Sequence, residues 1–125
     1  MIVATVSGTF EVDLETGELE PVDVALEPPA VFALNLPRVV AAAAAGATVV
    51  AVVAAKPPLL VSHDAGSTWR AAGRGLPPGR AVAIDETDPD TIVYAARNRL
   101  YVSRNGGVFW TALAVELPEV TGISL

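Results

Sequence analysis

LLVSHDAGSTW at residues 59–69 and LYVSRNGGVFW at residues 100–110 align without a gap. Identical residues, among them Ser62 with Ser103, Gly66 with Gly107, and Trp69 with Trp110, set the separation at 41 residues. The likeness extends back to VVAAK at 52–56 and VYAAR at 93–97. The chain therefore contains an internal repeat, which is the first signal to interpret in a sequence.

A third, degenerate copy of the repeat lies at the N-terminus. Residues 1–3 match residues 91–93 at a separation of 90, and the same separation places Gly17 on Gly107. Glu20 stands where the tryptophan would be. Between the first and second copies the separation is 49, so eight extra residues lie between 24 and 36.

The repeat predicts an all-β chain. Each copy contains short apolar runs bounded by Gly, Pro, Asp and Asn, as successive strands do, and a period of 40–45 residues is the length of one propeller blade. The strands predicted from the second and third copies lie at 39–45, 48–55, 80–85, 91–96, 100–103 and 109–113. We therefore expect a β-propeller of four-stranded antiparallel blades, with three blade equivalents in the 125 residues.

The repeat boundaries divide this single domain, residues 1–125. Blade 1 contributes three strands within 1–23 and is followed by a loop insertion at 24–36. Blade 2 covers 37–77 and blade 3 covers 78–117. Residues 118–125 match the first strand of a blade, and the chain begins at the second, so we expect the last strand to complete the blade begun by the first.

Three blades are too few to close a ring, because propellers close with four to eight. We therefore predict a homodimer in which residues 121–125 of one chain complete the blade begun by residues 2–6 of the other, giving a six-bladed ring. Such pairing removes exposed sheet edges. The alternative interpretation is a fragment of a longer propeller with no independent function.

The segment at 62–69 reads Ser-x-Asp-x-Gly-x-Thr-Trp, and the segment at 103–110 differs by Asn105 and Phe109 at the Asp and Thr positions. This pattern resembles the Asp box of the BNR repeat propellers, which include sialidase-type, sortilin-type and photosystem II assembly-factor propellers. The resemblance implies a structural role for eight residues: Ser62, Asp64, Gly66, Trp69, Ser103, Asn105, Gly107 and Trp110. Asp and Asn side chains can hydrogen-bond turn amides, and glycine can take the positive φ of such a turn.

Composition excludes several classes of function. The chain has no cysteine and one histidine, His63, so we expect no metal site and no cofactor, and a cytoplasmic location. Residues 1–37 carry seven acidic residues and no basic one, which argues against nucleic acid as a partner. The uncharged run at 39–55 is near the lower length limit of a membrane helix, but the repeat assigns it to two strands.

No catalytic residue can be identified. Tyr94 and Tyr101 occupy strand positions that packing explains, and the arginines do not reproduce the arginine cluster that the sialidase resemblance would require. The acidic loop at 85–90 lacks the glycine and terminal glutamate of a calcium-binding loop. We therefore do not expect an enzyme.

The predicted topology separates the charges. Loops between second and third strands share one end of a propeller with the loops that join successive blades, and this end carries most of the basic side chains. Together with an aromatic residue of the insertion they form the candidate binding face: Arg38, Lys56, Arg74, Arg80, Arg97, Arg99 and Phe32. We expect a protein-interaction or assembly module that binds an acidic protein or anionic ligand there. The alternative is a lectin-like propeller that binds carbohydrate or small anions.

Overall fold

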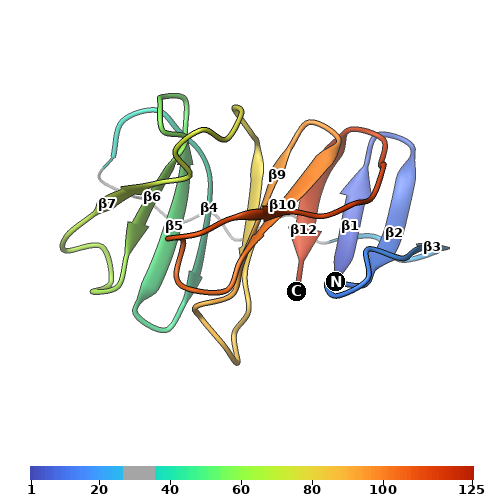
Figure 1. The fold of residues 1–125 in the computed structure, drawn as a ribbon, viewed down its shortest axis with the longest axis horizontal. Coiled ribbons are helices and arrows are strands. Elements are labelled where there is room, and N and C mark those ends of the chain that lie inside the picture. Colours follow the sequence, from blue (N-terminus) through green and yellow to red (C-terminus); the bar gives the residue numbers. More distant parts are fainter. Residues whose placement is uncertain (27–35) are drawn as a thin grey trace.

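The computed structural model describes residues 1–26 and 36–125. Twelve strands in these residues form three four-stranded antiparallel sheets, which stand side by side (Figure 1). The all-β prediction, with blades of four antiparallel strands, is confirmed. No helix in the described part of the chain is long and apolar enough to cross a membrane.

Each sheet corresponds to one blade. Blade 1 has the order β12 (Val120–Ser124), β1 (Ile2–Thr5), β2 (Gly8–Val12), β3 (Leu19–Val22). Blade 2 has the order β4 (Val39–Ala45), β5 (Thr48–Val53), β6 (Leu59–Ser62), β7 (Arg70–Ala72). Blade 3 has the order β8 (Ala81–Ile84), β9 (Ile92–Ala96), β10 (Arg99–Ser103), β11 (Thr111–Ala112).

Blade 3 lies between the other two (Figure 1). One apolar core joins blade 2, through side chains such as Val50 and Leu59, to Ile92 and Tyr94 of blade 3. The second core joins the opposite face of blade 3 to Val3, Val12 and other residues of blade 1. Every residue of β8 and β9 is buried, because both faces of blade 3 are covered.

The pairing of β1 with β12 joins the two ends of the sequence within one chain. Ile2 lies opposite Ser124 and Val3 opposite Ile123. We expected these strands to pair, but between two chains; here one chain completes all three of its blades. Pairing within a chain avoids the loss of translational and rotational freedom that association costs, so blade 1 needs no strand from a partner.

The separation of 41 residues holds in the third strands but not throughout. The connection from β4 to β5 has two residues and that from β8 to β9 has seven, whereas five residues join β5 to β6 and two join β9 to β10. Leu59 consequently pairs with Val52, while its counterpart Leu100 pairs with Ala95. The match of 52–56 with 93–97 at a separation of 41 was therefore wrong by two residues, because the loops before and after the second strand differ in length in opposite directions.

The first hairpin, Ser62–Trp69, is held by its own side chains. The hydroxyl of Ser62 donates to Asp64 Oδ1 over 2.7 Å and accepts from the Gly66 amide at 2.8 Å. Asp64 also accepts from the Thr68 amide, at 2.8 Å, and from the Thr68 hydroxyl. These bonds lower the pKa of Asp64 from its ordinary 3.8 to about 2, with the Thr68 hydroxyl as the largest cause.

The second hairpin, Ser103–Trp110, repeats this geometry. Asn105 accepts from the Ser103 hydroxyl at 3.0 Å and from the Phe109 amide at 2.9 Å, and Gly107 has the same φ of 90° as Gly66. Trp110 then lies edge-on to Tyr94 with ring centroids 6.3 Å apart. The hairpin thus delivers its tryptophan to the core between blades 2 and 3.

A cysteine pair tests the closure of blade 1. Directly paired residues of an antiparallel sheet lie within the Cα separation that a disulfide needs, so Ile2→Cys with Ser124→Cys should oxidise within one chain. We expect a single-chain band on a non-reducing denaturing gel and a gain of about 2–4 kcal/mol in unfolding free energy over the reduced form. A disulfide-linked pair of chains as the main product would instead show strand exchange.

The low pKa of Asp64 predicts pH-dependent stability. The folded pKa lies below the ordinary value, so the carboxylate stabilises the fold above about pH 3.8, and this contribution is lost as pH falls toward 2. Asp64→Asn should lower the urea midpoint at pH 7, and its difference from the parent should shrink between these pH values. Glu86→Gln, which neutralises an exposed carboxylate, is the control and should not show this convergence.

Candidate functional site: the basic end

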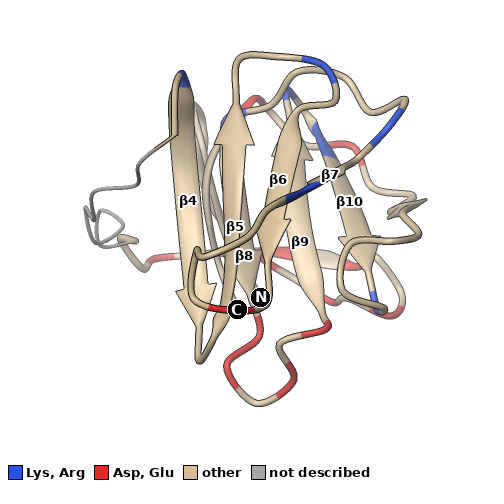
Figure 2. Cartoon of the chain, turned by 90° about the vertical axis from the view of Figure 1, so that its left-hand side faces the viewer, with Lys and Arg blue, Asp and Glu red and all other residues tan. Residues whose placement is uncertain are grey.

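Six basic side chains gather at one end of the blades because of strand topology. The basic end comprises Arg38, Lys56, Arg74, Arg80, Arg97 and Arg99, and these residues lie in, or directly beside, the loops joining second to third strands and successive blades. Figure 2 shows most of the Lys and Arg at this end and most of the Asp and Glu at the opposite end. The expected separation of charge is therefore present, although Phe32 lies outside the described residues.

Two of these arginines have a fixed, unusual backbone. Arg38 has φ of 60° and Arg97 has φ of 57°, a region that residues other than glycine seldom occupy. Their carbonyls accept from the amides of Ala54, at 3.0 Å, and Val120, at 2.7 Å. Because each carbonyl is bonded to a neighbouring segment, the loops that present these side chains are anchored rather than free.

Acidic residues also occur at this end, which the sequence prediction had not counted. Arg80 forms an ion pair with Glu119 at 3.4 Å, between side chains that are each about half exposed. In residues 1–26 and 36–125, Arg80 is the one member of the basic end that forms an ion pair. The remaining five guanidinium and ammonium groups lack a carboxylate partner within the described chain.

A pocket of about 590 Å³, which we call the proline pocket, lies between two members of the basic end. Lys56 and Arg74 border it, and its other lining residues are Pro57, Pro58, Gly75, Leu76, Pro77 and Pro78. This lining contains two cations and no carboxylate. Proline fixes φ, so four of the eight residues that shape the pocket have little conformational freedom.

Tyr94 holds Pro77, one of the residues that line this pocket, through a hydrogen bond. Its hydroxyl donates to the carbonyl of Pro77 at 2.8 Å, and burial raises the pKa of Tyr94 to about 12, so the phenol keeps its proton. The Cα of Gly79 lies so close to Tyr94 and the Ala95 carbonyl that a methyl group there would collide with both. The repeat predicted neither this pocket nor the hydrogen bond from Tyr94 to Pro77. The adjacent pairs Pro57-Pro58 and Pro77-Pro78 are the sequence feature that could have indicated the pocket.

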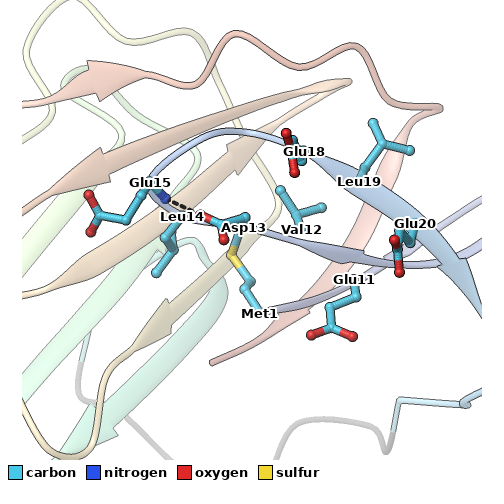
Figure 3. A pocket seen from close by; sticks show the side chains of 9 residues that line it. All are labelled: Met1, Glu11, Val12, Asp13, Leu14, Glu15, Glu18, Leu19 and Glu20. Atoms are coloured by element: carbon cyan, nitrogen blue, oxygen red, sulfur yellow. Dashed lines mark hydrogen bonds between the residues drawn. The ribbon is translucent and has the colours of Figure 1, made fainter.

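The opposite end carries a second hollow, of about 720 Å³, on blade 1 (Figure 3). Five carboxylates line it, from Glu11, Asp13, Glu15, Glu18 and Glu20. Asp13 accepts from the amides of Thr16 and Glu15, which lowers its pKa and gives it a turn-forming role. Among the described residues, no group of three or more His, Cys, Asp or Glu could hold a metal ion.

A third pocket, of about 640 Å³, lies along the inner strands β4, β8 and β12. Most of its lining is aliphatic, with Arg80 and two hydroxyl side chains as its polar members. Leu26 covers it from the segment that follows blade 1 and lies near the Cα of Gly122. The strands β4, β8 and β12 thus border a largely aliphatic hollow.

The comparisons with known proteins give information on the fold of the chain. No protein-family model and no curated protein matches the chain. Among solved structures, it resembles the GH74 enzyme of Niastella koreensis, a β-propeller enzyme, with a TM-score of 0.52 and 23% identity. The match covers 94% of this chain and 18% of that one, so the chain spans less than a fifth of its neighbour. This likeness supports a propeller-like arrangement of the three blades and extends to the fold alone.

Proposed function

We propose that the chain is a non-catalytic binding module of the Asp-box propeller type, and that its basic end binds an acidic segment of another protein. The clustering of cations without an ion-pair partner among residues 1–26 and 36–125, around a pocket lined by four prolines, carries this proposal. Lys56 and Arg74 line the proline pocket, and Arg38, Arg97 and Arg99 lie at the same end of the blades. The hydrogen-bond geometry shared by the two hairpins supports the Asp-box assignment.

The chemistry of the pocket supports binding rather than catalysis. Acid–base catalysis needs a group that exchanges a proton near the operating pH, and the lining offers an ammonium, a guanidinium, four prolines, a leucine and a glycine. Guanidinium groups pair well with carboxylates and can do so in bidentate geometry. The prolines and Leu76 make much of the lining apolar, so the best occupant is a short acidic segment that also carries an apolar side chain.

A charge reversal tests this proposal. We expect Arg74→Glu to weaken binding of a fluorescein-labelled peptide of alternating Glu and Leu by about tenfold, or roughly 1.4 kcal/mol. Affinity of the parent should fall as salt is raised from about 0.05 to about 0.5 M, since exposed charges are screened. Fluorescence anisotropy measures both effects.

Arg104→Glu is the matched control. Arg104 lies outside the basic end, pairs with Glu15 at 2.8 Å, and is half exposed, so the same change of charge occurs away from the pocket. The control should retain parental affinity within about twofold (~0.4 kcal/mol). Equal weakening by both variants would mean that net charge, not the basic end, governs binding, and absence of parental binding would contradict the proposal.

A further inference from the structure

Asn105 and Gly106 form the dipeptide in which an asparagine side chain is chemically least stable. The chain has three asparagines: Asn35 precedes leucine, Asn98 precedes arginine, and Asn105 precedes glycine. Loss of the side-chain amide begins when the backbone nitrogen of the next residue attacks Cγ. Glycine hinders that attack least, because it has no Cβ and the widest range of backbone conformations. The second hairpin therefore contains a site of chemical modification that the basic end does not use.

The modification needs water and no other reactant. The Gly106 nitrogen forms a bond to Cγ of Asn105, the Cγ–Nδ2 bond breaks, and Nδ2 leaves as ammonia after taking the proton of the Gly106 amide. Water then opens the resulting cyclic imide at either carbonyl carbon. Opening at Cγ restores the peptide bond and leaves aspartate in place of Asn105. Opening at the main-chain carbonyl leaves isoaspartate, in which the backbone runs through Cβ and Cγ.

The folded chain holds the attacking group in place. The amide of Gly106 donates to the carbonyl of Asp90 at 2.9 Å, and the carbonyl of Gly106 accepts from Arg70 Nη2 of blade 2 at 2.9 Å. Gly106 is buried, and a methyl carbon on its Cα would lie 3.3 Å from Cε1 of His63. Because the nitrogen must give up its proton to attack, the bond to Asp90 has to break first.

The group under attack is held as well. Asn105 is exposed, but its Oδ1 accepts from the Ser103 hydroxyl at 3.0 Å and from the Phe109 amide at 2.9 Å. The same hydroxyl accepts from the Gly107 amide at 2.9 Å. Closure of the imide turns Cγ toward Gly106 and breaks the bonds to Oδ1. Folding thus restrains both reacting groups, and the reaction requires local opening of the hairpin.

The hairpin has a place for an aspartate product but not for isoaspartate. In the first hairpin, Asp64 accepts from the Ser62 hydroxyl at 2.7 Å and from the Thr68 amide at 2.8 Å. Asn105 accepts from the same two donors, a serine two residues before it and an amide four residues after it. An aspartate would accept both with a charged oxygen, which strengthens the bonds. Isoaspartate would instead lengthen the backbone by a carbon inside this turn.

We propose that Asn105 is a deamidation site, that the folded hairpin protects it, and that its aspartate product takes the place that Asp64 has in the first hairpin. Opening of the hairpin starts the reaction, because it releases the Gly106 amide and the Asn105 side chain together. The extent of conversion therefore records how often the hairpin has opened. None of these steps involves the basic end or its ligand.

Peptide mapping by mass spectrometry tests the protection. The full chain is kept in mildly alkaline buffer with and without guanidinium chloride, and conversion of Asn105 is followed with time. We expect conversion in the native chain to be slower by at least about tenfold, since only the opened hairpin reacts. Asn98, which precedes arginine, should convert more slowly than Asn105 in the unfolded chain. A smaller difference between native and unfolded chains, or no conversion of Asn105 in the unfolded chain, would overturn the proposal.

Two serine variants locate the protection in the second hairpin. Ser103→Ala removes the hydroxyl that donates to Asn105 and should speed native conversion by about fivefold, the effect of losing one intramolecular hydrogen bond. Ser62→Ala removes the equivalent hydroxyl from the first hairpin and is the matched control, so its native conversion of Asn105 should equal that of the parent. Equal acceleration by both variants would contradict protection by the hairpin itself. If Ser103→Ala loses its far-ultraviolet β-sheet spectrum, Arg70→Ala replaces it, because this change of an exposed side chain also frees Gly106.

Asn105→Asp tests the product. Its urea midpoint at pH 7 should be at least that of the parent, because the carboxylate keeps both hydrogen bonds of the asparagine. A lower midpoint would show that the hairpin does not accept aspartate and would overturn the assignment of the product.

Discussion

Apolar packing of sheet face against sheet face holds this molecule together, and blade 3 is where it is most complete. A strand covered on both faces must be apolar at every position, and β9 meets this condition from Ile92 to Ala96. Burial of such side chains contributes about 25 cal/mol per Å². Blade 3 stands between the two other sheets, and the two apolar cores lie on its opposite faces.

The two hairpins are held by their own polar side chains. Asp64 and Thr68, like Asn105 and the Phe109 amide, are occupied in turn hydrogen bonds. Their polar groups hold the hairpins and bring Trp110 into a core. The cations of the basic end lie at the opposite end of the blades, in or beside the loops that join second to third strands and successive blades.

Much of the fold could be predicted because the strands expected in one copy of the repeat can be compared with those expected in another copy. The strands at 39–45 and in the region of 91–96 followed from apolar runs and turn residues, and the basic end followed from strand direction. The strand register could not be predicted. Val52 is equivalent to Ala95 only because the loop at 54–58 is longer than its counterpart at 97–98, and the loop at 85–91 is longer than its counterpart at 46–47. Nor could the proline pocket be predicted, since it joins residues on two separate loops. The sequence indicated that the first and last strands pair. A pattern of strands cannot show whether the two paired strands belong to the same chain or to two chains.

The pairing of β1 with β12 also determines when blade 1 can be completed during synthesis. A ribosome makes β1 first and β12 more than a hundred residues later, and sheets that depend on such distant pairings form slowly. Until Val120–Ser124 emerges, β1 has β2 on one side and an unpaired edge on the other. Nascent chains with unpaired strand edges are prone to aggregate. The N-terminal blade is therefore the last of the three to be completed, although its strands are the first to be translated.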